Sequence, residues 1–233
     1  MPCYNESAGI EPVLMEWLLF LRGLKLSSFE IVVINDGSTD GTGRILDKLR
    51  RESRELRVFH QLNVGHGRAV RRGYETARGR YVAQVDSNGC YEVSDFLRLW
   101  DQRERYSMIL GRRTHRLDSI FRRGASRVSR RLIAWLFDVH ISDPSTPFRI
   151  MRNDVLKSLL PQIPPHQHST NLALSVLFWR QGDAVVHELP VPFRFRKAGK
   201  SRVGGWASVM ATGTALRELV ALRFVTVKAV PTY

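Results

Sequence analysis

Short apolar runs alternate with amphipathic stretches along the first half of the chain. Residues 29–36 (FEIVVIND) form a continuous run rich in β-branched residues, the pattern of a strand buried on both faces. The strands predicted in this half are 29–36, 56–62, 81–86 and 107–113. The segments with helical spacing are 11–26, 43–52, 65–77 and 93–106. This alternation predicts an α/β fold with helices flanking a mostly parallel sheet.

The pattern changes after Asp118. A basic helical segment (118–138), the motif DPSTPFRIMR (143–152), two more helical stretches and an extended segment (184–196) follow. Residues after 203 have an amphipathic pattern without a linker before them. We therefore expect one domain over 1–203 and an amphipathic helical tail over 204–233. The apolar runs are shorter than the ~18 residues that a membrane span needs, so they are interpreted as core helices.

The first predicted helix has no strand before it. The chain opens with MPCYNES, which has the composition of a turn leaving a strand. A sheet that lacks an inner strand exposes unpaired N–H and C=O groups on its neighbours. We therefore expect Met1 to be an internal methionine, with the native protein starting upstream. The alternative is a shorter sheet that manages without this strand.

Charge narrows the set of partners. The 233 residues include 36 Lys and Arg against 22 Asp and Glu, a formal net charge of +14. Such a surface suits phosphates, nucleic acid or anionic lipid. No zinc pattern, RNP motif or convincing helix-turn-helix accompanies the charge, so we expect no nucleic-acid partner. Two cysteines, Cys3 and Cys90, offer no disulfide framework and favour a reduced cytosolic setting.

Three predicted strand ends are polar: PCYNES, NDGSTDGT and VDSNGC. Ligands of open α/β sheets bind at the carboxyl ends of strands. The first end can present Asn5 and Glu6 to a ligand. The second carries Asp36, whose carboxylate can accept N–H bonds from a base or ribose, or else serve as a turn former.

Taken together, PCYNE, VVINDGSTDGT, NVGHGRAVRRGYETARGRYV and VDSNG, in this order and spacing, resemble the family 2 glycosyltransferases of the GT-A fold. The later DPSTPFRIMR and RKAGKSR resemble the branch that includes dolichyl-phosphate mannose synthases and bacterial polyprenyl-phosphate glycosyltransferases. The resemblance covers Pro2 to about Arg202. It implies an inverting enzyme that moves a sugar from a UDP- or GDP-sugar to a polyprenyl phosphate.

The resemblance also implies a donor site. This site has four parts: the loop around the base and ribose, the acid that contacts the nucleotide, the turn beneath the nucleoside and the loop over the diphosphate. The residues that match them are Pro2, Tyr4, Asn5, Glu6, Asp36, Gly65, Gly67, Ala69, Arg196, Ser201 and Arg202. Small residues in the turn let the backbone approach closely, and guanidinium groups bind phosphate oxygens well. The alternative for RFRKAGKSR is a solvated basic loop.

The metal motif departs from the branch pattern. Asp86 matches the first acid of Asp-x-Asp-x-Gln, but Asn88 and Cys90 occupy the other two positions. Mg2+ and Mn2+ prefer hard oxygen ligands. Asn88 can offer a neutral carbonyl oxygen, whereas the thiol of Cys90 is a poor ligand for these ions. We expect a weakened Mg2+ or Mn2+ site at Asp86 and Asn88, with basic groups of 196–202 taking part of the charge neutralisation. Pro147, where the branch usually has glycine, puts the geometry of its loop in doubt.

The acceptor site implied by the resemblance is rich in arginine. Arg113 and Arg123 match acceptor-binding arginines, and Arg127 is a third candidate, within the basic stretch 111–132. A phosphate acceptor is already anionic and needs no general base. Asp143 is expected to orient an arginine or approach the sugar, not to act as a base. The alternative is a solvated basic face, or one that touches anionic lipid headgroups.

Two further functions stay open. A saccharide or other hydroxyl acceptor would need a general base, and Asp118 is the one acid within 111–132. A degenerate, non-catalytic homologue fits the altered metal motif. The expected partners are a nucleotide sugar, a polyprenyl-phosphate lipid and an anionic membrane surface, with the protein peripheral at the cytoplasmic, inner face of the membrane. The sequence identifies neither the sugar nor the oligomeric state.

Overall fold

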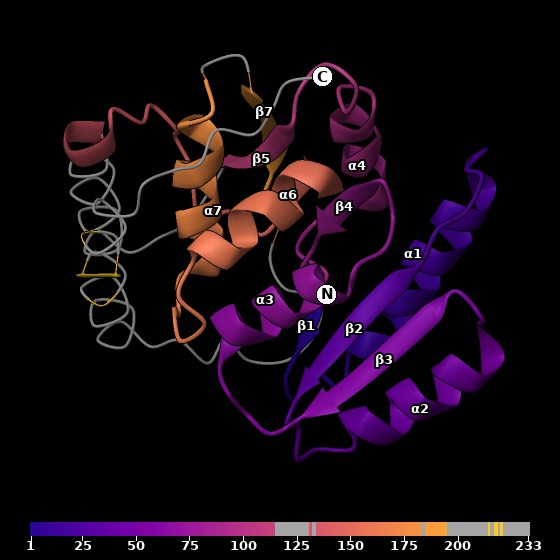
Figure 1. The fold of residues 1–233 in the computed structure, drawn as a ribbon. Coiled ribbons are helices and arrows are strands. Elements are labelled where there is room, and N and C mark those ends of the chain that lie inside the picture. The colour runs from indigo at the N-terminus through magenta and orange to yellow at the C-terminus, as the bar shows by residue number, and fades with distance from the viewer. Residues whose placement is uncertain are drawn as a thin grey trace.

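The computed structural model describes residues 1–114, 131, 134–182, 185–194, 214, 217, 218 and 220. Strands and helices alternate through the first half, as the pattern predicts (Figure 1). The elements are β1 (Pro2–Cys3), α1 (Ile10–Gly23), β2 (Ile31–Asp36), α2 (Thr42–Glu52), β3 (Leu56–Gln61), α3 (His66–Thr76), β4 (Tyr81–Gln84), α4 (Val93–Trp100), β5 (Met108–Thr114), β6 (Arg149–Arg152), α6 (Asn153–Leu159), the 3-10 helix η1 (Leu160–Gln162), α7 (Thr170–Trp179) and β7 (Val186–Pro192).

The strands form two sheets. The first has the order β1-β2-β3 and is parallel throughout. The second has the order β4-β6-β5-β7, in which β6 runs antiparallel to both neighbours and β5 and β7 are parallel. The α/β architecture is therefore as predicted. β6 adds an antiparallel strand inside DPSTPFRIMR, a segment that the pattern did not identify as a strand.

Helices cover both faces of the strands. Ile109 and Ile150 point into a core cluster with α1, α2 and α4, whereas their neighbours Met108 and Met151 point into a second cluster with α3, α6 and α7. Successive strand residues face opposite sides. The alternation of these four residues between the two cores therefore shows a layer of helices on each face of the strands.

The first strand is present only as a short element. β1 consists of two residues, with Pro2 opposite Ile34 and Cys3 opposite Asn35. The Met1 ammonium adds one bond to the Val32 carbonyl at 2.9 Å. The opening segment, predicted as a turn leaving a strand, thus contains a two-residue strand followed by the turn.

Two further predictions concern the apolar helices and the C-terminal tail. Among the described residues, no helix is long and apolar enough to cross a membrane. Most of the predicted tail (204–233) lies outside the described residues, so the division at 203 stays a prediction.

Candidate functional site

The loops after β1 and β2 are joined by side-chain hydrogen bonds. The Asn5 amide N–H donates to Ser38 Oγ at 2.9 Å, and the Thr39 amide donates to Asn5 Oδ1 at 2.7 Å. The Glu6 amide donates to Thr42 Oγ1 at 2.9 Å. These bonds fix the loop that carries Asn5 and Glu6 at the carboxyl edge of the first sheet. Tyr4, which follows β1 (Pro2–Cys3), is 37% exposed.

Asp36 fastens the turn that leads into α3. Its carboxylate is 4% exposed and accepts bonds from Gln61 Nε2 at 2.7 Å, the Val64 amide at 3.0 Å and the Gly65 amide at 2.9 Å. Hydrogen bonds of this kind satisfy most of the acceptor capacity of a buried carboxylate. In this structure Asp36 therefore fastens the turn, and its contact with a nucleotide stays a prediction.

Different structural requirements account for the small residues at the start of α3. Gly65 has φ +93, a left-handed conformation that favours glycine. A side chain on Gly67 would lie 1.8 Å from the His168 carbonyl oxygen, so Gly67 is required by close packing against the segment before α7. Ala69 is 1% exposed and lines a cleft between β2 and β4. Gly67 and Ala69 thus meet packing requirements of the fold, and their place beneath a nucleoside stays a prediction.

Asp86 follows β4 and has an unsatisfied carboxylate oxygen. Its Oδ1 is buried and has no hydrogen-bond partner among the described residues. A buried carboxylate oxygen without a partner costs free energy unless a ligand supplies one. Asn88 Oδ1 already accepts a bond from the Cys90 amide at 3.1 Å, and Cys90 is 4% exposed within the core cluster of α1, α2 and α4.

The residues present fit a cation at Asp86 only in part. Asp86 offers one oxygen that lacks a partner, and Asn88 offers a neutral oxygen that is already engaged. In the part of the chain that the structure describes, no three His, Cys, Asp or Glu side chains gather into a metal-binding group. Any Mg2+ or Mn2+ here would need further ligands from a substrate.

Arg113 and Asp143 form a bidentate ion pair at the end of β5. Arg113 Nε lies 2.7 Å from Asp143 Oδ2, Nη2 lies 2.7 Å from Oδ1, and the Arg113 amide adds a bond at 3.3 Å. The two side chains are only 13% and 8% exposed. Burial opposes the charged guanidinium, but the bonds and charge of Asp143 outweigh burial, and Asp86 contributes as well, so the pKa of Arg113 is raised. Asp143 therefore orients an arginine, one of the two roles predicted for it.

Arg149, which sequence reasoning did not select, anchors the loop that carries Asp143. It is 1% exposed and donates to the backbone carbonyls of Thr146 at 2.9 Å, Pro144 at 3.0 Å and Asn171 at 3.0 Å. Burial lowers its pKa. Pro147 sits within this loop, which is closed by a bond from the Thr146 amide to the Asp143 carbonyl at 3.1 Å. An arginine within an apolar run such as PFRIM is the sequence signal that could have identified it as buried.

Several predicted residues lie outside the described part of the chain. These are Arg123, Arg127, Arg196, Ser201 and Arg202. The acceptor arginines beyond Arg113 and the diphosphate loop therefore stay predictions. Asn5 and Glu6 follow β1, and Asp86 follows β4. Arg113 lies at the end of β5 and binds Asp143. The structure thus places these residues at the carboxyl ends of strands or in a loop beside them.

The chain is similar to known proteins over most of its length. A family model described as Glycosyl transferase family 2 matches residues 1–160. A dolichyl-phosphate beta-glucosyltransferase from Dictyostelium discoideum is 33% identical over 132 residues, which cover 51% of this chain and 40% of that protein. An undecaprenyl-phosphate 4-deoxy-4-formamido-L-arabinose transferase from Edwardsiella ictaluri is 28% identical over 207 residues, 88% of this chain and 62% of that protein. The chain thus spans less than two thirds of either relative.

A solved structure shares the fold. Glucosyl-3-phosphoglycerate synthase from Mycobacterium tuberculosis, in complex with Mn2+, uridine-diphosphate and phosphoglyceric acid, superposes with a TM-score of 0.70 over 97% of this chain and 77% of that one. At 19% identity this likeness concerns the fold alone. The predicted GT-A fold and the predicted resemblance to family 2 are both confirmed.

Proposed function

Because the chain belongs to glycosyl transferase family 2, we propose that it catalyses inverting transfer of a sugar from a UDP- or GDP-sugar to a polyprenyl phosphate. The names of the two relatives, which act on dolichyl phosphate and undecaprenyl phosphate, support this acceptor class. The observation that carries the proposal is a carboxylate and a guanidinium at the carboxyl ends of β4 and β5. Asp86 has a buried oxygen without a described partner, and Arg113 is held in place by Asp143.

Arg113 is suited to hold an anionic acceptor. Its Nε and Nη2 groups bind Asp143, whereas Nη1 takes part in none of the hydrogen bonds found among the described residues. The outward N–H groups of a fixed guanidinium form short, charge-assisted bonds to phosphate oxygens. A phosphate acceptor carries its own negative charge, so Arg113 needs only to position it for in-line attack on the sugar carbon.

Asp143 acts as a positioning residue in this account. It binds Arg113 through both carboxylate oxygens, and its backbone amide donates to Glu188 Oε1 at 3.0 Å. A general base must be free to accept the proton of a hydroxyl acceptor. The engagement of Asp143 with Arg113 favours the lipid phosphate over a saccharide acceptor.

The leaving diphosphate needs positive charge. We propose that Asp86 and Asn88 hold Mg2+ or Mn2+ weakly, together with oxygens of the donor. When bound, the ion would stabilise the charge that develops on the diphosphate. The predicted loop residues Arg196, Ser201 and Arg202 would share this task through charge-assisted bonds.

The proposed site of action is the cytoplasmic face of a membrane. The formal net charge of +14 supports peripheral contact with anionic lipid headgroups. Flotation with vesicles of phosphatidylglycerol, compared with vesicles of phosphatidylcholine, tests this part. We expect binding to the anionic vesicles only, and loss of that binding at high salt.

A transfer assay tests the reaction. Purified protein with Mn2+ is given radiolabelled UDP- and GDP-sugars with either undecaprenyl phosphate or a soluble oligosaccharide. We expect labelled lipid only, with Asp86→Asn reducing the rate at least a hundredfold and Asp101→Asn, on an exposed carboxylate after α4, leaving it unchanged. Label on the oligosaccharide would show the hydroxyl-acceptor function instead. No label on either acceptor would identify a non-catalytic homologue.

A further inference from the structure

Tyr91 has a buried hydroxyl group that lacks a hydrogen-bond partner. The residue lies in the segment between β4 and α4, shortly after Asp86, and it is only 3% exposed. Its Oη atom is buried and makes no hydrogen bond with any residue that the structure describes. Taking a hydroxyl group out of water without replacing its hydrogen bond costs free energy. A bound ligand that offers an acceptor would remove this cost.

The ring of Tyr91 is held by two other aromatic rings. It stacks on Phe148, with the ring centroids 4.6 Å apart and the planes 6° from parallel. It also meets Phe193 nearly edge to face, at 5.8 Å and 69°. The guanidinium carbon of Arg113 in turn lies 5.9 Å from the centroid of the Phe193 ring. These contacts fix the orientation of the Tyr91 ring and bring it close to the arginine of the candidate site.

The Tyr91 hydroxyl also lies among the charges of the candidate site. Burial raises the pKa of this hydroxyl above its usual range. The charge of Arg113 opposes the shift in pKa, whereas the charges of Asp86 and Asp143 add to it. The hydroxyl is therefore close enough to feel both Asp86 and the ion pair of Arg113 with Asp143. It also keeps its proton, so it can donate one hydrogen bond to a ligand.

Thr146 is the protein group that offers an alternative partner, because it lies close to the Tyr91 hydroxyl. Its Oγ1 donates to the Gly111 carbonyl at 2.8 Å and accepts a bond from the Phe148 amide at 3.3 Å. Thr146 Oγ1 is thus already engaged, and no hydrogen bond joins it to Tyr91. If Thr146 were the true partner, removal of the Tyr91 hydroxyl would destabilise the fold, which a measurement of stability can detect.

We propose that the Tyr91 hydroxyl donates a hydrogen bond to an anionic phosphate oxygen that is bound between Asp86 and Arg113. This inference rests on the proposed function, which brings two phosphate groups to this place: the leaving diphosphate of the nucleotide sugar and the phosphate of the acceptor lipid. Both offer the same chemistry, an oxygen that carries negative charge and has no proton to give, and a neutral phenol donates well to such an oxygen. A bond to the leaving diphosphate would strengthen as negative charge develops there.

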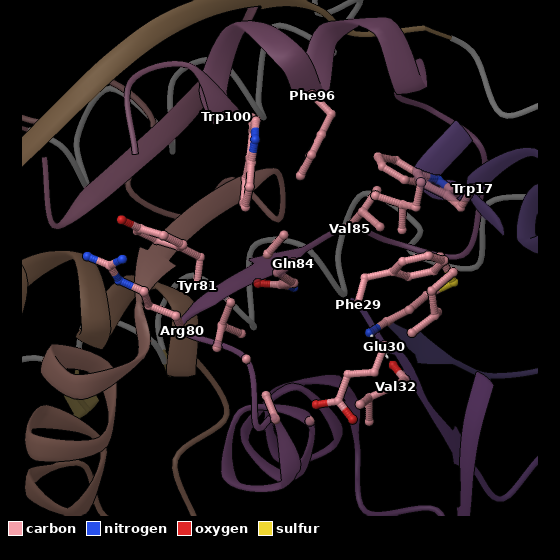
Figure 2. Close-up of a pocket in the computed structure, with 18 of the residues that line it drawn as sticks. Trp17, Phe29, Glu30, Val32, Arg80, Tyr81, Gln84, Val85, Phe96 and Trp100 are labelled. Carbon is pink, nitrogen blue, oxygen red and sulfur yellow. Dashed lines mark hydrogen bonds between the residues drawn. The ribbon is translucent and has the colours of Figure 1, made fainter. Parts of the chain in front are cut away.

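Thermal stability tests whether the hydroxyl serves the fold. Tyr91→Phe removes one oxygen atom and keeps the ring on Phe148, so it should raise Tm by about 2 to 4 °C, because the unsatisfied group is gone. Tyr74→Phe is the matched control. Tyr74 is 2% exposed on α3, and its hydroxyl binds Asn171 Oδ1 at 2.9 Å and the Oε1 atom of Gln84, which Figure 2 shows on β4. Tyr74→Phe should lower Tm by at least about 2 °C.

Ligand binding tests whether the hydroxyl contacts phosphate. Titration calorimetry in Mn2+ measures the affinity of the unchanged protein, Tyr91→Phe and Tyr74→Phe for UDP, GDP and farnesyl phosphate. We expect Tyr91→Phe to weaken binding of at least one of these ligands by about tenfold, the effect of losing a hydrogen bond to a charged group. A loss confined to the nucleotide identifies the diphosphate as the partner, and a loss confined to farnesyl phosphate identifies the acceptor phosphate. Tyr74→Phe should leave all the affinities unchanged.

Two results would overturn the inference while the proposed function stands. One is equal affinity of Tyr91→Phe and the unchanged protein for every ligand that the unchanged protein binds. The other is a fall in Tm of Tyr91→Phe like that of Tyr74→Phe, which would show that Thr146 satisfies the hydroxyl. Failure of the unchanged protein to bind any of the three ligands would instead contradict the proposed function, and the phosphate contact of Tyr91 with it.

Discussion

Replacing Asp143 with asparagine should destabilise the protein strongly while keeping its shape. The amide retains one oxygen, but its NH2 group would then face an N–H group of Arg113, donor against donor. Breaking a buried ion pair by neutralising one partner costs about 3 to 5 kcal/mol. The side chains of Arg113 and Asp143 are 13% and 8% exposed, so solvent screens this pair little.

Urea unfolding followed by circular dichroism measures this cost. Asp143→Asn should lower the midpoint with little change in the slope, and at about 2 to 4 °C per kcal/mol it should lower Tm by roughly 6 to 20 °C. Asp101→Asn is the matched control, because Asp101 is exposed after α4. In a double-mutant cycle with Arg113→Met, we expect a coupling energy of at least about 1.5 kcal/mol. A loss below about 1 kcal/mol, with no coupling, would refute the reasoning.

Three further predictions concern groups outside that pair. Arg149→Met should lower the free energy of unfolding by about 3 kcal/mol in urea titration, because three buried backbone carbonyls each lose a hydrogen bond from the guanidinium; an unchanged midpoint would contradict the anchoring role. Gly67→Ala should destabilise the protein, because its Cβ would lie 1.8 Å from the His168 carbonyl oxygen, whereas Gly23→Ala, with nothing within 4 Å, should not; equal Tm values would refute this. Burial lowers the pKa of the Met1 ammonium from 8.0 to about 6. The unfolded chain therefore binds more protons between pH 6 and 8, so this group's contribution to stability is full above pH 8 and is lost as the pH falls to 6; N-terminal acetylation should remove this dependence in thermal melts.

The alternation of elements was predictable because it depends on local pattern. The run IVVI gives a strand buried on both faces, and the boundaries of α2 and α3 fall within a residue or so of the amphipathic segments. α4 ends at Trp100, well before the predicted 106, because residues 101–105 form turns although their composition suits a helix. β6 was missed because four residues between a proline-rich loop and a helix carry too little periodicity to predict a strand.

The candidate site was predictable in its position but less so in the roles of its residues. The carboxyl ends of strands could be located from sequence, so Asp86 and Asn5 were expected at one edge. The reason for Gly67 depends on a carbonyl about a hundred positions away, and the role of Asp36 depends on amides of a different loop. Such contacts between distant segments are set by tertiary packing, which no local pattern records. The same applies to Arg149, whose acceptors include three backbone carbonyls.

Nucleotide binding at Asp86 tests the central claim most directly. Titration calorimetry with UDP and GDP, each with Mn2+ and with EDTA, is run on the unchanged protein beside Asn88→Asp. The account predicts that one nucleotide binds and that EDTA weakens this binding. The added carboxylate of Asn88→Asp should tighten binding in Mn2+ by about tenfold, or about 1.4 kcal/mol. Binding of neither nucleotide under any of these conditions would contradict the transferase function.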